Sequence, residues 1–581
     1  MKVRLARTAG FCMGVRRAIE LALTTAHDQP GDIHTYGPLI HNPQVLELLA
    51  GKGIRVLDHI PPPGSRQGGT AIIRAHGVPP EDKQSLQAAG FNQVKDGTCP
   101  RVIRVQAIIR QAAKRGAWVV IVGDADHPEV VGLKAHAEGR GWVVSGPEEV
   151  AGLPALTQVV AVAQTTQSQD TFSRVIAELE RRFGQVEVHD TICEATHSRQ
   201  DEVLRLAAEV DGVVVVGGKQ SGNTKRLAQL AAQGGKPVFL VETEADLDRA
   251  ALARLGSVGV TAGASTPNWM IKQVVRELGS IRSQGQAPLP FWLSRVYRFL
   301  VRSQVVVAGG AAGMTVASSL LQGHRPRPIL VGVAFFYIYA MHILNHFLDK
   351  EAGQYNEPDR AQFLAKHQVF LIGSGVASAA AALFLCAMLG SLPFWLVLVM
   401  SVLGLLYSVP VIPAGLERRI GIQSLKDIPG SKTISAALAW AVIVAVLPAV
   451  AAGDASPGPA GLAFIYAMVM VFVRCAFFDI LDVQGDLIVG KETIPIVLGE
   501  SKTRRLLMSL ILGLALLLAL APLWGLPSGL AWALILPVAG LGGMQIIIMR
   551  GLMMPGAASE GLVDLNFWLA GAVALAWAGW R

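Results

Sequence analysis

Three cysteines in the first half of the chain occupy similar local settings. Cys12, Cys99 and Cys193 are separated by 87 and 94 residues, and each precedes a predicted helix, in GFCMGVRRAI, GTCPRVIRVQ and TICEATHSRQ. A thiolate at a helix N-terminus is stabilised by the helix dipole and by free backbone amides. Three similar lobes that each offer one thiol to a common centre predict a metal or an iron–sulfur cluster, and a four-iron cubane with three protein thiolates leaves one iron open to substrate. The alternative is that these cysteines are small buried apolar residues.

Polar side chains beside glycine or proline form a second group of candidates. They occur in GPLIHNPQV, RAHGVPP, DHPEVVG, KQSGNTKRL and GASTPNW, which read as loops whose side chains can point into a shared cavity. We expect a donor-rich pocket suited to a multiply charged anion such as a diphosphate. Its candidates are His41, His76, His127, Ser221, Asn223 and Ser265. Glu129 is a lone carboxylate two residues from His127, which suggests proton delivery.

Taken together, these stretches resemble the 4-hydroxy-3-methylbut-2-enyl diphosphate reductase (LytB/IspH) family across residues 1–280. The resemblance implies an α/β trilobal fold with a pseudo-threefold arrangement around a [4Fe–4S] cluster, whose unique iron binds the substrate hydroxyl. The three cysteines are the implied cluster ligands. In that family two electrons and two protons remove the allylic hydroxyl as water, which yields isopentenyl and dimethylallyl diphosphate. A ferredoxin or a flavodoxin is the electron donor that the resemblance suggests.

The resemblance also implies roles for the polar residues. The six donors would hold the diphosphate, Glu129 would relay protons beside His127, and Thr165 would help to place the hydroxyl-bearing end. The family often has a second serine where this chain has Gly222. We therefore expect the diphosphate contact at that position to be lost or to come from a backbone amide.

Charge and hydropathy divide the 581-residue chain into two halves. Of the 94 Asp, Glu, Lys and Arg residues, 61 lie before residue 290, while the mean hydropathy of the whole chain is positive. The net charge of +8 lies largely in loops between apolar runs, which argues for membrane orientation and against nucleic-acid binding. Five widely spaced cysteines do not make a disulfide framework, which indicates a reducing compartment. The stretch MKVRLARTAG lacks the apolar core of a signal peptide, so we expect the first half in the cytosol.

The predicted elements change type at the same division. Up to residue 280, β-branched runs such as WVVIVG (118–123), VVAVAQ (159–164), GVVVVGG (212–218) and KPVFLVE (236–242) alternate with helical patterns, which predicts parallel sheets. Residues 281–298 are expected to be a linker that becomes an interfacial segment. Residues 299–581 are expected to be an all-α domain of nine transmembrane helices. The predicted spans lie near 299–321, 329–348, 368–390, 393–412, 433–453, 460–480, 506–524, 528–549 and 562–580.

Carboxylates cluster at two places beside the predicted spans, although each is costly to bury near a membrane. They lie in NHFLDKEAGQYNEPDR (345–360) and in DILDVQGDLIVGKETIP (479–495), both on the predicted cytosolic side. Carboxylates three or four residues apart share one helical face. Two such faces can bind Mg²⁺, which prefers oxygen ligands and bridges to phosphates.

These clusters resemble the two aspartate-rich motifs of the UbiA superfamily of intramembrane prenyltransferases, which have nine transmembrane helices. The first motif departs from the family because His346 and Gly353 stand where aspartates are usual. The resemblance implies Mg²⁺-dependent transfer of a prenyl group from its diphosphate to an acceptor that the sequence does not name. We favour an active enzyme over a degenerate one. The matching residues are Asn345, Asp349, Asn356, Pro358 and Arg360 in the first motif, and Asp479, Asp482, Asp486, Lys491 and Pro495 in the second.

Three basic residues near these motifs have two interpretations. Arg360, Lys426 and Lys432 are candidate diphosphate contacts, or they are ordinary positive charges on the cytosolic side of the membrane. Cys386 and Cys475 lie inside predicted spans and are expected only to pack.

The two halves together predict a bifunctional isoprenoid enzyme of the inner membrane with its reductase half in the cytosol. An alternative makes the membrane half a catalytically degenerate anchor or a transporter, although a transporter would place its polar residues nearer the bilayer midplane. Another alternative makes the soluble half an iron–sulfur redox sensor, for which a diphosphate pocket has no use.

Overall fold

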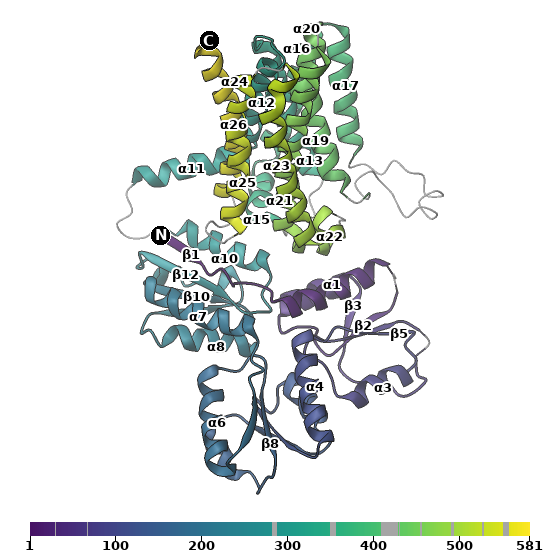
Figure 1. Ribbon diagram of the computed structural model, residues 1–581, viewed down its shortest axis with the longest axis vertical. Coiled ribbons are helices and arrows are strands. Elements are labelled where there is room, and N and C mark those ends of the chain that lie inside the picture. The colour runs from purple at the N-terminus through teal and green to yellow at the C-terminus, as the bar shows by residue number, and fades with distance from the viewer. Residues whose placement is uncertain are drawn as a thin grey trace. The chain divides into compact units, whose positions relative to one another are not determined.

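The computed structural model describes two compact units, Met1–Gln286 and Ala287–Arg581 (Figure 1). Its strands lie in the first unit, and the described part of the second unit is helical. The fold is therefore an α/β domain followed by an all-α domain, as the sequence predicts. The described residues are 1–28, 31–66, 68–281, 288–348, 356–407, 428, 430–453, 456–489, 493–525, 528–549 and 557–580.

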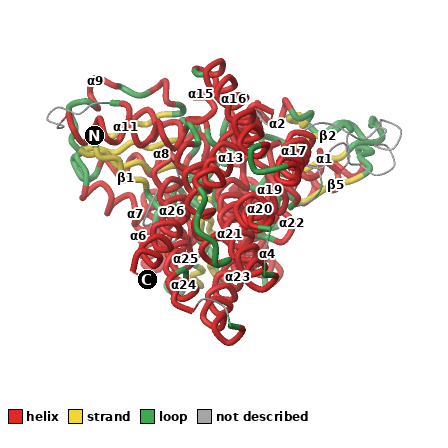
Figure 2. Tube along the Cα trace, turned by 90° about the horizontal axis from the view of Figure 1, so that it is seen from above, coloured by secondary structure: helices red, strands yellow, loops and turns green. Residues whose placement is uncertain are grey.

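Three separate four-stranded parallel sheets make up the first unit. The strands are β1 (Lys2–Leu5), β2 (Ile33–Tyr36), β3 (Ile54–Leu57), β4 (Thr70–Ile73), β5 (Gln93–Asp96), β6 (Trp118–Val122), β7 (Gly141–Val144), β8 (Val159–Ala163), β9 (Val186–His189), β10 (Gly212–Val216), β11 (Val238–Val241) and β12 (Ser257–Ala262). Their orders are β3-β2-β4-β5, β7-β6-β8-β9 and β11-β10-β12-β1. β1 and β5 belong to different sheets and lie at opposite sides of the view in Figure 2.

All three sheets have the same strand order. Across each sheet the strands lie in the order second, first, third and fourth, numbered along the chain within the lobe. In the third lobe the fourth strand is β1, from the start of the chain, which pairs parallel with β12 from Lys2 opposite Ser257 to Leu5 opposite Val260. The chain therefore closes its last lobe with its first strand. This arrangement confirms the predicted trilobal domain.

Helices connect these strands and cover the sheets. They are α1 (Met13–Asp28), α2 (Pro43–Gly51), α3 (Pro80–Ala88), α4 (Pro100–Lys114), α5 (Pro128–Ala135), α6 (Gln169–Phe183), α7 (Glu194–Glu209), α8 (Gly222–Ala232), α9 (Arg249–Leu252) and α10 (Asn268–Ser280), with short 3₁₀ turns η1 (Pro147–Gly152) and η2 (Glu244–Asp246). The strands β6, β8 and β10 are almost entirely buried, as their continuous apolar runs indicate for parallel sheets that are covered on both faces. α1, α4 and α7 each follow the fourth strand of a lobe and lead to the first strand of the next.

Long apolar helices make up the second unit. They are α11 (Pro288–Arg302), α12 (Val305–Leu321), α13 (Pro328–Leu348), α15 (Pro358–Lys366), α16 (Gln368–Ala387), α17 (Ser391–Leu406), α19 (Ser431–Ala441), α20 (Leu447–Ala452), α21 (Pro457–Val489), α22 (Ile494–Leu498), α23 (Glu500–Leu520), α24 (Ser528–Ala533), α25 (Ile535–Met549) and α26 (Ala557–Trp580), with a π turn η4 (Val442–Val446) between α19 and α20 and a 3₁₀ turn η5 (Ala521–Trp524). Large apolar side chains such as Val369, Phe384 and Trp580 face outward, as expected of a surface in contact with lipid. The second unit is a multi-pass membrane domain.

The predicted number of nine spans is not confirmed. Among the described residues, seven helices are long and apolar enough to cross a membrane, or eight if one bent pair is a single span. That pair is Arg295–Arg302 with Val305–Leu321, bent by 69° at Gln304, whose backbone is left-handed with φ 64°. The predicted span at 393–412 corresponds to α17, which has 16 residues, and the end of that span lies outside the described residues.

Small residues bring α12 and α26 into close contact. A Cβ built on Gly571 of α26 would lie 2.6 Å from the Cα of Gly313 on α12, while a Cβ on Gly310 would lie 2.9 Å from the Phe567 Cβ. Small residues are the usual means by which membrane helices approach closely. The packing of α12 on α26 therefore depends on the absence of these side chains.

We predict that Gly571→Ala destabilises the membrane unit, because the added methyl group must push α12 away from α26. Overpacking of this kind costs about 1–3 kcal/mol, against a gain of about 1 kcal/mol in helix propensity. The control is Gly579→Ala on the same helix, where nothing lies within 4 Å of the new Cβ. Thermal unfolding of the full chain in detergent measures both variants. A Gly571→Ala variant as stable as Gly579→Ala would contradict the prediction.

Candidate active site

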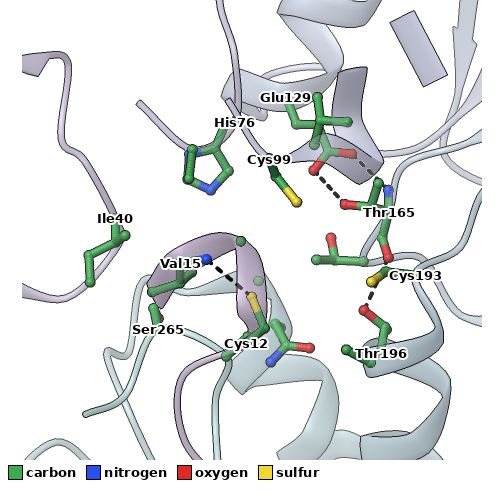
Figure 3. A pocket seen from close by; sticks show the side chains of 18 of the residues that line it. Cys12, Val15, Ile40, His76, Cys99, Glu129, Thr165, Cys193, Thr196 and Ser265 are labelled. Atoms are coloured by element: carbon green, nitrogen blue, oxygen red, sulfur yellow. Dashed lines mark hydrogen bonds between the residues drawn. The ribbon is translucent and has the colours of Figure 1, made fainter. Parts of the chain in front are cut away.

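The three predicted thiols meet in one cavity of the first unit, where their sulfur atoms face a common space (Figure 3). Each thiol lies in the short loop after the fourth strand of a lobe, directly before α1, α4 or α7. The three environments have the same backbone hydrogen bonds. Each cysteine carbonyl accepts from the amide four residues later, at Arg16 (2.9 Å), Ile103 (3.0 Å) and His197 (3.1 Å), and each cysteine amide donates to the loop after the third strand, at Ala264 (3.1 Å), Ala75 (2.9 Å) and Thr165 (2.9 Å).

Gly14, two residues after Cys12, allows close packing against the thiol of Cys99. A Cβ on Gly14 would lie 2.5 Å from the Cys99 Sγ, so the first turn of α1 touches the thiol of the next lobe. The Val15 amide lies 3.5 Å from the Cys12 Sγ and points a backbone donor at this sulfur. Burial raises the pKa of the Cys99 thiol, and the other two thiols add to that rise. A bound cation would reverse this effect by favouring the thiolates.

The arrangement of these donors fits an iron–sulfur cluster. Two thiolates on a single zinc ion would lie about 3.8 Å apart, given tetrahedral geometry and Zn–S bonds of about 2.3 Å. Among the described residues, the side chains grouped closely enough for one metal ion are His41, His76 and His127, and the three cysteines are not such a group, which favours a larger polynuclear centre for the thiols. Thiolate ligands at helix N-termini and free backbone donors nearby are features that such clusters use.

The loops after the first strands provide one row of polar side chains. His41, His127 and Ser221 each lie five residues beyond the end of β2, β6 and β10, respectively. His127 and Ser221 are the N-caps of α5 and α8. The Nδ1 atom of His127 accepts from the Glu129 amide at 3.1 Å, so the proton of the neutral ring lies on Nε2.

The loops after the third strands provide a second row. His76, Thr166 and Ser265 each lie three residues beyond the end of β4, β8 and β12, respectively, and all three line the cavity. Ser265 also lies against the first lobe, because its hydroxyl donates to the carbonyl of His41 at 3.3 Å. In parallel sheets, ligands bind beyond the carboxyl ends of the strands, which is where both rows lie.

Three histidines form the centre of this polar wall. The ring centroids lie 4.8 Å apart for His41 and His76, 5.7 Å for His41 and His127, and 5.4 Å for His76 and His127. Their nitrogen atoms also lie close enough together to hold a metal ion. Within the described residues, the buried His41 Nε2, His76 Nδ1 and Asn223 Nδ2 have no hydrogen-bond partner. Unsatisfied buried polar atoms are rare and costly, so this wall is built for a polar ligand.

Burial and mutual repulsion keep these rings uncharged in the free pocket. Burial lowers the pKa of His127 to about 4, with His41 as the next cause. It also lowers the pKa of His41, and it lowers that of His76 well below the usual value. Arg74 adds to all three shifts. The rings can therefore act as neutral N–H donors at pH 7, or gain protons when an anion is bound.

Asn223 and Gly222 lie at the start of α8, directly after Ser221. Asn223 is buried, while a Cβ on Gly222 would meet nothing within 4 Å. The first turn of a helix presents free backbone amides, which favour anions. The open space beside Gly222 would accept a larger side chain.

Glu129 is buried and bound to one partner residue. One carboxylate oxygen accepts from the Thr165 amide at 2.7 Å and the other from the Thr165 hydroxyl at 2.8 Å (Figure 3). Burial raises the pKa of Glu129, while the two Thr165 hydrogen bonds lower it. The pair can hold a proton between two groups that both line the cavity.

All twelve residues predicted for this half line the same cavity, namely Cys12, His41, His76, Cys99, His127, Glu129, Thr165, Cys193, Ser221, Gly222, Asn223 and Ser265. Sequence reasoning missed Arg199, which also lines it and is 5% exposed. Its spacing gave no signal, since a residue six positions along a helix lies about 120° around the axis from the starting residue. Thr166, the counterpart of His76 and Ser265, was missed as a site residue as well.

The carboxylates of the second unit lie near the end of α21, where Asp479, Asp482 and Asp486 recur at helical spacing. Asp479 is buried, accepts a hydrogen bond from the Thr433 hydroxyl, and lies 3.3 Å from the Lys432 Nζ. Lys432 is thus placed against the second motif. Thr433 was missed from the sequence.

The structure connects the two predicted motifs at one point. The Asn356 side chain donates to the Asp486 Oδ1 at 2.8 Å, and both side chains are buried. Asn345 is half-buried on α13, and its Oδ1 has no partner among the described residues. The predicted Asp349, Gly353, Lys426 and Lys491 lie outside the described residues.

Arg360 belongs to a network of charges that the sequence did not predict. It forms ion pairs with Glu357 and with Glu560 of α26. On α21, Arg474 donates through Nε and Nη2 to the two carboxylate oxygens of Asp564, at 2.5 and 3.2 Å. These pairs join α15, α21 and α26 near the second motif.

Family models match both halves of the chain. The model described as LytB protein matches residues 3–279, and the model described as UbiA prenyltransferase family matches residues 306–553. The 4-hydroxy-3-methylbut-2-enyl diphosphate reductase of Geobacter sulfurreducens is 43% identical over 278 residues, which cover 48% of this chain and 97% of that protein.

Solved structures resemble each half separately. A structure of (E)-4-hydroxy-3-methyl-but-2-enyl diphosphate reductase matches with 38% identity and a TM-score of 0.39, over 48% of this chain and 100% of that one. A UbiA homologue from Archaeoglobus fulgidus bound to GPP and Mg²⁺ matches with 15% identity and a TM-score of 0.35, over 48% of this chain and 98% of that one.

We predict that the protein takes up protons when inorganic diphosphate binds beside His41, His76 and His127, which we call the histidine wall. The lowered pKa values leave His41, His76 and His127 neutral at pH 7, and a nearby anion raises those values. Binding therefore weakens as the pH rises from about 6 to about 8. Calorimetry of the full chain in buffers of different ionisation enthalpy counts the protons.

Diphosphate itself also exchanges protons in this pH range. The comparison between variants therefore measures the proton uptake that is due to the histidines. His76→Asn should take up fewer protons than the unmodified chain. His136→Asn, a half-buried histidine that does not line the cavity, should leave the number unchanged. Equal uptake by the unmodified chain and His76→Asn would contradict the prediction.

Proposed function

The chain belongs to the LytB family through its first unit and carries a UbiA prenyltransferase family domain in its second, and on this premise we propose a bifunctional isoprenoid enzyme. The first unit reductively removes the hydroxyl of 4-hydroxy-3-methylbut-2-enyl diphosphate. Two electrons and two protons are consumed, the allylic C–O bond breaks, and water leaves with isopentenyl or dimethylallyl diphosphate. The observation that carries this proposal is the meeting of three thiols, each directly before a helix, with the three histidines and the Glu129–Thr165 pair in one cavity.

Cys12, Cys99 and Cys193 would hold a [4Fe–4S] cluster, as the geometry of the three thiols supports. When bound, the cluster supplies electrons and an open coordination position for the hydroxyl oxygen. The electrons come from a one-electron protein donor such as a ferredoxin or a flavodoxin.

The residues around the cluster position the substrate and its protons. His41, His76 and His127 with Ser221, Asn223 and Ser265 hold the diphosphate through neutral or protonated donors, and the backbone amide of Gly222 is an additional donor. The diphosphate thus anchors the substrate at one end of the cavity. Thr165 lies between Glu129 and the space that the thiols face, so its hydroxyl can place the substrate hydroxyl and pass on the Glu129 proton. The raised pKa of Glu129 allows it to hold that proton near neutral pH.

In the second unit we propose Mg²⁺-dependent transfer of a prenyl group. Asp479, Asp482 and Asp486, with Asn345 and Asp349, would hold the metal ions, and Lys432, Lys426 and Arg360 would contact the diphosphate. The allylic C–O bond breaks as diphosphate leaves, a bond to the acceptor forms, and the acceptor loses a proton. The UbiA family match disfavours the alternatives of an anchor or a transporter.

We further propose that the chain lies in the inner membrane with its first unit in the cytosol. This orientation places Arg325 and Arg327 on the outer side and most loop cations inside, as the positive-inside rule requires. The reductase then works where reduced electron donors are found.

We predict that Glu129→Gln lowers the turnover of the reductase about 10²- to 10⁴-fold, because the amide cannot deliver a proton. The Michaelis constant should change little, since the diphosphate is held elsewhere. The assay uses the full chain, purified without oxygen, with a chemical reductant. Glu148→Gln, an exposed carboxylate outside the cavity, is the control. Full turnover by Glu129→Gln would refute the role of Glu129 as proton donor, and full turnover by Cys99→Ser would refute the role of Cys99 as a cluster ligand. An unmodified, cluster-loaded chain without turnover would refute the reductase assignment.

We predict that Asp482→Asn removes Mg²⁺-dependent product formation in membranes that contain the full chain. The expected loss is at least about 100-fold, because the leaving diphosphate loses part of its charge stabilisation. The assay supplies labelled prenyl diphosphates of several lengths and a panel of aromatic acceptors. Glu500→Gln on α23 is the control. If no product of the panel depends on Asp482, the membrane unit is an anchor.

A further inference from the structure

A buried arginine breaks the threefold pattern of the first unit. Six residues after the thiol, α1 carries Ala18 and α4 carries Val105, which are 0% and 2% exposed. The equivalent residue of α7 is Arg199, which is 5% exposed. Two lobes therefore fill this position with small apolar side chains. The third lobe buries a charge there, which is costly unless the charge has a use.

The guanidinium group of Arg199 connects the segments that carry two of the three thiols. Its Nη2 donates to the carbonyl of Gly10, two residues before Cys12, at 2.7 Å. Its Nη1 donates to the carbonyl of Ala195, two residues after Cys193, at 3.0 Å. Arg199 thus holds the loop before α1 against the first turn of α7.

The charge of Arg199 is left largely uncompensated by protein carboxylates. Among the described residues, Arg199 forms no ion pair with a carboxylate, and its buried Nε has no hydrogen-bond partner. After the thiolates of Cys12 and Cys193, Glu202 is the acidic group that acts on the pKa of Arg199, but its oxygens accept from the Arg7 and Thr8 amides. Burial lowers the pKa of Arg199, while the thiolates of Cys12 and Cys193 raise it. An arginine remains protonated in proteins, so a full positive charge lines the cavity and is hydrogen-bonded to the two segments that carry Cys12 and Cys193.

We propose that Arg199 is a positioning residue that sets the retention and the reduction potential of the cluster held by the three thiols. This inference rests on the proposed reductase function. A cluster with thiolate ligands becomes more negative when it accepts an electron, and a fixed positive charge in a region of low dielectric constant stabilises the reduced state. The two backbone hydrogen bonds fix the Cys12 and Cys193 segments at the separation that the cluster needs.

The experiment compares Arg199→Gln with Arg199→Lys in the full chain, purified and reconstituted without oxygen. Arg205→Gln on the exposed face of α7 is the control. Iron and acid-labile sulfide report the cluster, and a dithionite titration followed by electron paramagnetic resonance gives the midpoint potential. The rate of iron loss to a chelator measures retention.

We expect Arg199→Gln to have a more negative midpoint potential and to lose iron roughly 10- to 100-fold faster. Arg199→Lys, which keeps the charge, should retain the potential of the unmodified chain, and Arg205→Gln should match it in both measurements. The proposal is also supported if Arg199→Gln loses the cluster and Arg199→Lys keeps it, because the two variants differ in the positive charge.

Two results would overturn the inference. One is an unchanged potential and rate of iron loss in Arg199→Gln. The other is a shifted midpoint potential in a folded, cluster-loaded Arg199→Lys, because this variant keeps the positive charge. If Arg199→Gln does not fold, Arg199→Lys still tests the inference, because a shifted potential in that variant contradicts it. An unmodified chain that binds no iron and sulfide would instead refute the proposed function.

Discussion

The parallel strand order that recurs in all three lobes determines where the functional side chains of the first unit lie. Parallel strands place all their carboxyl ends at one edge of a sheet, and each lobe directs that edge toward the common cavity. The loop after the first strand carries His41, His127 or Ser221, and the loop after the third carries His76, Thr166 or Ser265. The loop after the fourth strand carries a thiol. The cavity is thus one structural motif used three times with different side chains.

That repetition explains which parts of the site could be read from the sequence. Cysteines 87 and 94 residues apart mark the same place in successive lobes, and the polar stretches mark the other two loops. The partner of β1 could not be predicted, because alternation within four residues does not identify a strand more than 250 positions away. Arg199 was missed since a charged residue in a helix usually faces solvent. The nine-span prediction counted apolar runs, which does not reveal a bend such as that at Gln304.

The second unit meets a different constraint, because carboxylates near lipid must be compensated within the chain. Asp479 is held by Thr433 and Lys432, and Asp486 is held by Asn356. Each of these contacts occupies one carboxylate oxygen of a candidate metal ligand and fixes its direction. The bidentate Arg474–Asp564 pair fixes α21 against α26 in the same region. The geometry of the second motif is therefore set by neutral and cationic partners on neighbouring helices.

Under the proposed function, both units bind a diphosphate, which stays on the product in the first reaction and leaves in the second. In the first reaction the diphosphate stays attached to the product, so histidines and amides that hold it reversibly are sufficient. In the second it is the leaving group and its charge grows as the bond breaks, so carboxylates that recruit Mg²⁺ are required. Histidines that gain protons when the diphosphate binds balance the charge that it already carries, and no growing charge has to be stabilised there. Because burial lowers the pKa values of the histidines in the absence of an anion, this balancing charge appears only when a diphosphate is bound.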